Sequence, residues 1–201
     1  MALNVKRIAL LSTATFLMGC FASAETTDMN ENKSLRQCES RFDFASQTEV
    51  ENWFPILDGV MGGRSTGVRF SESEHMTFKG KINTNGGGFS SLRRALTPGE
   101  LEGADSLNLS LLQDGRAYRM TFRTNERFRG RLVSYQLSIP QSSSGIWQDI
   151  KLPLKDFRTS VFGREVPAAP FDPAEVREIG FIIADGIDGP FELNIRTIQC
   201  G

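Results

Sequence analysis

The segment from Asp58 to Gly67 has the residue types of a ligand-binding loop. It reads Asp-Gly-Val-Met-Gly-Gly-Arg-Ser-Thr-Gly. Glycine adopts positive φ without penalty and lets the backbone approach another group closely. Two interpretations are open: the glycines shape a tight double turn between strands, or they bring backbone N–H groups to a surface that binds a ligand. In the second interpretation the candidate binding residues are Asp58, Gly62, Gly63 and Ser65.

Polar side chains that could bind an anion or a sugar alternate with apolar ones along several predicted strands. Apolar side chains at every second position, as at Tyr118, Met120 and Phe122, predict that the residues between them share the opposite face of a sheet. That face would carry Arg93, Arg119, Thr121, Arg123, Ser134 and Gln136. Arginine presents a planar fork of donors that suits a carboxylate, a phosphate or a sugar. The candidate binding residues are Arg93, Arg123 and Gln136; the alternative is the ordinary solvated face of an antiparallel sheet.

Aromatic and titratable residues give little indication of catalysis. Trp53 and Trp147 are candidate platforms for a sugar ring, although tryptophan also commonly packs in cores. The single histidine, His75, has no nucleophile-elbow serine to serve, so we expect an exposed residue without a catalytic role. Asp185 and Asp188 each precede a glycine and are interpreted as turn residues rather than as a general acid/base pair. With no nucleotide-binding or metal-ligand motif in the sequence, we expect a protein that is not an enzyme and has no cofactor or metal.

The elements that must position these residues are mostly strands. Alternating patterns and turn signals predict strands within residues 69–82 (two strands), 89–96, 107–111, 118–123, 133–139, 147–152, 181–184 and 191–198. Thr48 and Glu51 have the spacing of a capping box and predict one short helical turn. Asp172 followed by Pro173 predicts a second short helix that ends at Gly180. The whole pattern predicts an all-β sandwich or jelly roll with one or two short helices.

The N-terminus is typical of an export signal, predicted over residues 1–24. Lys6 and Arg7 precede a short apolar run that is too short to span a bilayer stably. A leader without significance and an organelle-targeting sequence are the alternatives. We expect an exported protein that is periplasmic or anchored to the envelope.

Two processing routes are open. Residues 22–24 form an A-x-A cleavage site, whereas residues 17–20 resemble a bacterial lipobox, in which the signal is residues 1–19 and Cys20 carries a lipid. A flexible tether is predicted over residues 25–40 and a single domain over residues 41–200.

Two further cysteines, Cys38 and Cys200, lie at opposite ends of the predicted domain. If the first and last strands are antiparallel neighbours, these residues fall side by side and can form a disulfide. The alternative is two free thiols at frayed ends. A disulfide suits an oxidising compartment, in agreement with export.

Composition limits the classes of partner. The 201 residues are 39% apolar and 23% charged, as expected for one globular domain with a real core. The formal net charge is −1, which indicates neither a nucleic-acid partner nor an anionic membrane surface. We therefore expect contact with a membrane only through a lipid on Cys20.

Several blocks in the same order along the chain resemble a known family. They are residues 53–67, 85–93, 118–124, 133–136, 147–154, 162–167, 179–185 and 189–193. Together they resemble the CIA30 family, the complex I intermediate-associated protein 30 domain, over roughly residues 41–198. The resemblance implies a galactose-binding-like β-sandwich, a fold class that often carries carbohydrate-binding modules. It names no reaction.

Two functions are consistent with these observations. By resemblance, the protein is an assembly or chaperone-like factor with a protein partner in a membrane or envelope complex. The mitochondrial relatives act in the matrix, however, whereas export would place this chain on the opposite side of the membrane. The alternative is a module that binds carbohydrate or another small ligand in the cell envelope.

Overall fold

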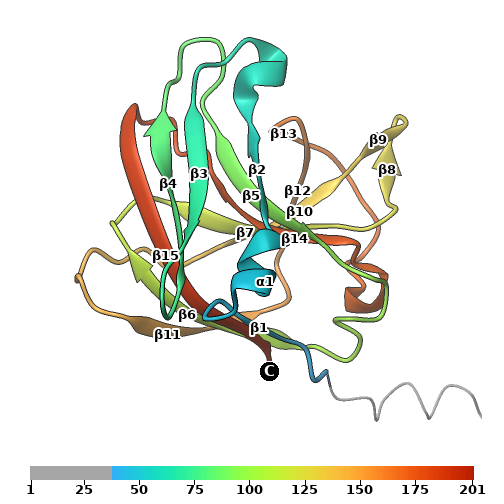
Figure 1. Cartoon of the computed structure of the whole chain (residues 1–201). Coiled ribbons are helices and arrows are strands. Elements are labelled where there is room, and N and C mark those ends of the chain that lie inside the picture. Colours follow the sequence, from blue (N-terminus) through green and yellow to red (C-terminus); the bar gives the residue numbers. More distant parts are fainter. Residues whose placement is uncertain (1–37) are drawn as a thin grey trace, which may run out of the picture.

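The computed structural model describes residues 38–201, which form two antiparallel β-sheets packed face to face (Figure 1). The predicted all-β sandwich is therefore confirmed. The expected export signal, the lipidation site at Cys20 and nearly all of the expected tether lie outside the described residues. Within residues 38–201, no helix is both long and apolar enough to cross a bilayer.

The first sheet has six strands in the order β11-β6-β15-β4-β3, and β1 pairs with β15 beside that path. Its strands are β1 (Arg41–Asp43), β3 (Thr66–Ser71), β4 (Met76–Ile82), β6 (Ser106–Gln113), β11 (Gln148–Pro153) and β15 (Gly189–Cys200). The long last strand, β15, runs through the middle of this sheet and joins the first strand to the rest (Figure 1).

The second sheet has seven strands in the order β13-β12-β10-β7-β14-β5-β2. They are β2 (Phe54–Leu57), β5 (Ser90–Ala95), β7 (Tyr118–Arg123), β10 (Ser134–Ser138), β12 (Arg158–Val161), β13 (Arg164–Glu165) and β14 (Glu178–Ile183). A separate two-stranded hairpin consists of β8 (Arg127–Phe128) and β9 (Arg131–Leu132). The hairpin lies near β10 and β12 and projects from the sandwich (Figure 1).

The helical elements are short: α1 (Gln47–Glu51) and two 3-10 turns, η1 (Asp58–Met61) and η2 (Pro173–Glu175). The predicted capping box is wrong by two positions, because Ser46 caps α1 by accepting a hydrogen bond from the Glu49 N–H at 3.4 Å. The predicted second helix is only one 3-10 turn, because β14 begins at Glu178 and pairs with two neighbouring strands.

The core lies between the sheets and is built from alternate side chains of each strand. Trp53 is fully buried in it and packs against the rings of Phe44 and Phe181, with centroids 5.4 and 5.9 Å away. Edge-to-face and tilted aromatic pairs of this kind add to the energy gained from buried area. The core fixes which face of each strand points outward.

The predicted disulfide between Cys38 and Cys200 is present, with the two Cα atoms 5.7 Å apart. The expected antiparallel pairing of the first and last strands is also confirmed, because β1 pairs with β15 in a register that aligns Phe42 with Ile198. The bond joins residues 162 positions apart and so closes almost the entire domain.

Replacing both Cys38 and Cys200 by serine should destabilise the domain by about 3–5 kcal/mol, since the cross-link restricts a long loop in the unfolded chain. Urea unfolding at pH 7 measures the difference. Adding a reductant should lower the stability of the wild type to that of the variant and leave the variant unchanged. Equal urea midpoints for the oxidised wild type and the variant would contradict this role.

Candidate functional site

The polar face predicted from the alternation is present on the outer side of the seven-stranded sheet. Register aligns Arg93 of β5 with Gly180 of β14, Gly180 with Thr121 of β7, and Thr121 with Gln136 of β10. Tyr118, Met120 and Phe122 of β7 are buried in the core instead. The strict two-residue period of the strands therefore places the arginines together on the opposite face.

This face is hollowed into a groove of about 310 Å³, which we call the arginine groove. Its floor carries Arg93, Arg119, Arg123, Ser134, Gln136 and Ser160. Ile56, Met61, Phe89 and Phe162 form an apolar rim, whereas Ile182 lies on the floor, on β14 between β5 and β7, and Ala184 follows the end of that strand. Three of the rim side chains are strongly exposed: Ile56 at 40%, Met61 at 51% and Phe162 at 71%. The site thus combines a cationic floor with an apolar border.

One carboxylate holds two of the arginines on the floor. The Oε1 atom of Glu178 accepts a hydrogen bond from Arg93 at 3.1 Å and lies 3.5 Å from Nε of Arg123. Arg119 donates to Oε1 of Gln136 at 3.0 Å. A guanidinium has five N–H donors, and these contacts use only part of them. The floor therefore has positive charge and donors available for an anionic ligand.

Burial disfavours the charged forms of the arginines on this face. Burial lowers the pKa of Arg93, the nearby Arg123 lowers it further, and Glu178 opposes both effects. Burial and Arg158 likewise lower the pKa of Arg119. Arginine nevertheless stays protonated near neutral pH because its ordinary pKa is so high. A bound carboxylate would relieve the mutual repulsion of these cations.

The N–H groups of Gly62, Gly63 and Ser65 in the glycine-rich loop are bound within the protein. Asp58 is fully buried, and its carboxylate accepts hydrogen bonds from the hydroxyl of Ser65 at 2.6 Å and from the N–H of Gly88 at 2.7 Å. The Phe89 and Ser65 N–H groups donate to the same carboxylate at 3.3 and 3.1 Å. The double-turn interpretation is therefore the correct one for Asp58 and Ser65.

The glycines around Asp58 make room for it. A Cβ atom at Gly63 or at Gly87 would overlap the carboxylate. The N–H groups of Gly62 and Gly63 donate to backbone carbonyls within the same loop, at 3.0 and 3.1 Å. Of these two glycines, expected as binding residues, Gly63 makes room for the carboxylate, and Gly62 ends η1 with a φ of +84°.

Asp58 also fixes part of the groove. It lies in η1 together with Met61, and its carboxylate binds the N–H of Phe89, so it connects two rim residues from distant segments. Burial raises the pKa of Asp58, but the hydrogen bonds from Ser65, Gly88 and Phe89 outweigh it, and the net pKa is lowered. The carboxylate is therefore ionised at neutral pH although it is buried without a cation.

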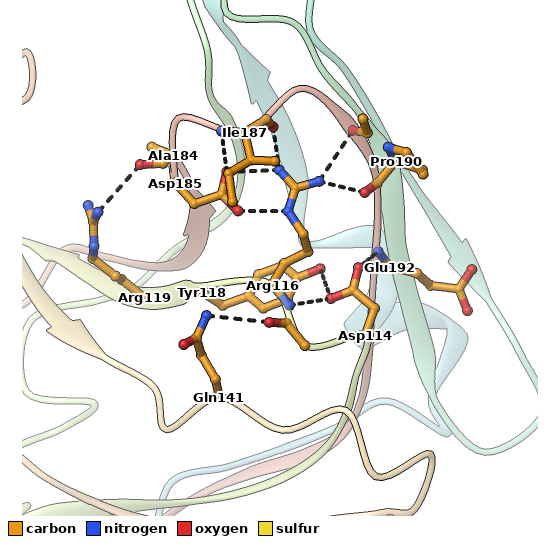
Figure 2. A network of polar contacts seen from close by, with 12 residues as sticks. Asp114, Arg116, Tyr118, Arg119, Gln141, Ala184, Asp185, Ile187, Pro190 and Glu192 are labelled. Atoms are coloured by element: carbon orange, nitrogen blue, oxygen red, sulfur yellow. Dashed lines mark hydrogen bonds and ion pairs between the residues drawn. The ribbon is translucent and has the colours of Figure 1, made fainter.

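A second polar network lies at the same end of the sheet, beyond the end of β14 (Figure 2). Arg116 donates to both oxygens of Asp185, at 2.7 and 2.8 Å, and to the carbonyl oxygen of Ile187 at 2.6 Å. Its hydrogen bonds lower the pKa of Asp185. Arg119 donates to the carbonyl of Ala184, next to this ion pair, at 3.4 Å (Figure 2). The network thus holds the loop that ends β14 against a floor arginine.

The turn interpretation of the two aspartates agrees with their contacts. Asp185 is paired with Arg116, whereas the carboxylate of Asp188 accepts a hydrogen bond from the Thr84 N–H at 2.7 Å. Both carboxylates therefore hold loops in place. Among residues 38–201, no three His, Cys, Asp or Glu side chains gather in a way that could hold a metal ion.

The tryptophans lie outside the groove. Trp53, expected as a sugar platform, is wrong in that role because it is fully buried and donates from Nε1 to Glu49 at 2.9 Å. Trp147 is half-buried, with the guanidinium of Arg196 4.1 Å from its ring centroid and the ring of His75 at 5.4 Å. His75 is itself half-buried rather than exposed.

Comparisons with known proteins agree with the resemblance. The sequence model of the family described as complex I intermediate-associated protein 30 (CIA30) matches residues 42–195. The mouse protein named "Complex I intermediate-associated protein 30, mitochondrial" is 23% identical over 186 residues, which cover 82% of this chain and 56% of the mouse protein. The chain therefore spans only a little over half the length of that relative.

Solved structures similar to the domain include two carbohydrate-binding modules. A family 11 module of the cellulosomal cellulase Lic26A-Cel5E of Clostridium thermocellum has a TM-score of 0.59 and 16% identity, and the match covers 83% of this chain and 96% of the module. The same family's module in complex with a β-1,3-1,4-mixed-linked tetrasaccharide gives a TM-score of 0.53, 17% identity and coverage of 75% and 89%. At these identities the similarity establishes the β-sandwich fold alone.

The Asp58→Asn variant should lose about 3 kcal/mol of folding free energy at pH 7, because an amide NH₂ would face N–H donors that now bind a carboxylate oxygen. The pKa of Asp58 is lowered by folding, so the carboxylate stabilises the fold above its unfolded pKa of about 4 and stops doing so as the pH falls through the folded value. The gap between wild type and variant in urea unfolding should therefore narrow below about pH 4. Asp149→Asn, at an exposed carboxylate, is the matched control. If the stability difference between wild type and Asp58→Asn does not change with pH, the ionised Asp58 carboxylate does not stabilise the fold as described.

The Asp185→Asn variant should lose about 2–4 kcal/mol, since it leaves the buried guanidinium of Arg116 without its carboxylate. Thermal and urea unfolding measure this loss. Asp188→Asn, in the same loop, should have a smaller effect because that carboxylate is exposed and its N–H partner is exposed as well. Equal effects of the two variants would show that the ion pair has no special importance.

Proposed function

The chain belongs to the complex I intermediate-associated protein 30 family, and from this membership we propose that it is a non-catalytic binding protein. We infer that it acts as an assembly or chaperone-like factor for a membrane or envelope complex. The mouse relative's name associates that protein with an intermediate of complex I. The arginine groove is the surface that we assign to partner binding.

The observation that carries the proposal is the groove itself. It is a concave surface that brings three arginines together with exposed apolar side chains, so it offers both charged donors and apolar area to a ligand. The titratable groups that surround it are engaged as structural partners: Glu178 with two arginines and Asp185 with Arg116. Binding without catalysis is the simplest use of such a surface.

Export is part of the proposal and rests on separate features. The N-terminal pattern around Lys6 and Arg7 supports it, as does the disulfide between Cys38 and Cys200, because such bonds persist mainly in oxidising compartments. A lipid on Cys20 would hold the protein at an envelope membrane. The partner complex would then be reached from the exported side.

Carbohydrate binding is the second candidate function. The fold similarity to carbohydrate-binding modules and the hydrogen-bonding groups of Ser134, Gln136 and Ser160 favour it. The location of Trp53 and Trp147 outside the groove weakens it, since sugar rings commonly stack on broad aromatic faces. A protein partner is therefore the preferred assignment.

The proposed function is tested by cross-linking and affinity capture from envelope extracts of the source organism. Wild type and the control Lys79→Gln/Lys151→Gln, whose changes lie on the six-stranded sheet, should both capture subunits of one membrane complex. Arg93→Gln/Arg123→Gln should reduce that capture at least about tenfold, because each charge-assisted hydrogen bond is worth about 1.5–3 kcal/mol. Capture that survives this change contradicts the groove as the docking surface.

A saccharide panel distinguishes the second function. Thermal stabilisation of the wild type by a defined oligosaccharide, lost in Arg93→Gln/Arg123→Gln and retained in the lysine control, would favour carbohydrate binding instead. Absence of stabilisation across neutral and anionic saccharides supports the protein-binding assignment.

A further inference from the structure

We propose that the arginine groove and the neighbouring β8–β9 hairpin form one continuous surface for an extended acidic peptide segment of a partner protein, with aliphatic side chains among its acidic ones. This inference rests on the proposed binding function and names the chemistry of the ligand. Four features of the described residues carry it: continuity, charge, an exposed aromatic residue, and the shape of the rim.

The groove continues into a second hollow under the hairpin. This second hollow also measures about 310 Å³ and is lined in part by Arg127, Gly130, Arg131 and Leu132. Both hollows share Arg123, Ser134 and Phe162 as lining residues. Figure 1 shows the hairpin beside β10 and β12, the strands that carry Ser134 and Ser160. A ligand in the groove can therefore extend along the sheet to the hairpin without leaving the surface.

Positive charge is concentrated along this path. Its lining includes five arginines, at positions 93, 119, 123, 127 and 131, and no acidic residue. Glu178 is the one carboxylate that pairs with any of them within residues 38–201. The whole chain has a net charge of −1, so this concentration is a local feature of the fold. Carboxylates spaced along a chain would complement it.

The hairpin arginines are held in place without being neutralised. Arg127 donates to the carbonyl oxygen of Gly130 at 2.9 Å, and the guanidinium of Arg131 lies 4.9 Å from the ring centroid of Phe162. Neither forms an ion pair with any residue of the described domain. Pre-positioned, unpaired cations lose little conformational entropy when a ligand carboxylate arrives.

Phe162 is an exposed aromatic residue in the two-residue turn between β12 and β13. Its φ is +49° and that of Gly163 is +75°, as a tight hairpin turn of this kind requires, and its side chain is 71% exposed. An exposed aromatic ring gains little stability from burial. Such a residue, placed where the two hollows meet, points to a contact with something outside the chain.

The rim favours a peptide over a polysaccharide. Ile56 and Met61 are aliphatic or flexible and offer no flat platform, Phe89 is half-buried, and Arg131 already lies over the ring of Phe162. Aliphatic side chains can pack on this border, and methionine adapts to varied partners. In an extended peptide successive side chains point to opposite sides, so acidic ones can face the floor while aliphatic ones meet the rim.

The test is fluorescence anisotropy on the full-length protein with a labelled peptide of repeated Asp-Leu-Glu-Gly units. Saturable binding that weakens at least about tenfold with rising salt is expected, because exposed charge pairs are screened. An Asn-Leu-Gln-Gly peptide and an Asp-Ala-Glu-Gly peptide should each bind at least about tenfold more weakly, since one lacks the carboxylates and the other most of the aliphatic surface.

Two variants test the path while leaving the folded core alone. Arg127→Gln/Arg131→Gln changes exposed hairpin residues and should weaken binding of the acidic peptide about tenfold or more. Phe162→Gly should also weaken it at least about threefold, yet raise the melting temperature, because glycine adopts the left-handed conformation without strain. The matched controls are Lys79→Gln/Lys151→Gln and Ile146→Ala, an exposed apolar residue outside both hollows.

Several results would overturn the inference. Equal affinity for the acidic and amide peptides, or hairpin and Phe162 variants that bind like their controls, would do so. An anionic oligosaccharide that binds through Arg93 and Arg123 when the acidic peptide does not would assign the groove to carbohydrate. If the peptide fails to bind while envelope capture still depends on those two arginines, the acidic-peptide inference is wrong and the proposed binding function stands.

Discussion

The buried carboxylate of Asp58 is the constraint on which the binding surface depends. It lies without a cation in the interior and is satisfied by one hydroxyl and three backbone N–H groups, two of which come from residues 30 and 31 positions along the chain. A buried anion left unsatisfied costs several kcal/mol, so the two glycine-rich segments must close on it. Met61 and Phe89 reach the rim of the groove as a result of that closure.

The remainder of the surface follows from strand geometry. Because the apolar side chains of β7 and β14 pack in the core, the residues between them face outward, and the antiparallel register places the arginines of β5 and β7 on either side of β14. Gly180 in the middle of β14 has no side chain to fill the floor. The Arg116–Asp185 ion pair then fixes the loop against which Arg119 donates. Packing, register and two buried carboxylates thus produce a cationic groove in a chain with almost no net charge.

The sequence is sufficient to predict the sandwich, the disulfide and the arginine face, because each rests on a short-range pattern or a pair of chain ends. Apolar and polar residues alternate strictly through Arg119 and Arg123, and alternate residues of a strand point to opposite faces of the sheet. The apolar rim was not predictable, since Ile56, Met61 and Phe162 come from separate segments that only the fold brings together. The sequence leaves both interpretations of Asp58 open for the same reason: two of its partners lie too far along the chain for any local pattern to indicate that it is buried.

The most direct test of the arginine groove as a binding surface for an acidic segment is an NMR titration that follows arginine Nε–Hε signals. With the Asp-Leu-Glu-Gly peptide, the signals of Arg93, Arg119 and Arg123 should shift and saturate together, because a bound carboxylate changes the surroundings of all three guanidinium groups. The signals of Arg41 and Arg64, which lie outside both hollows, should stay in place. Shifts confined to arginines outside the groove, or none at all at saturating peptide, would contradict the account.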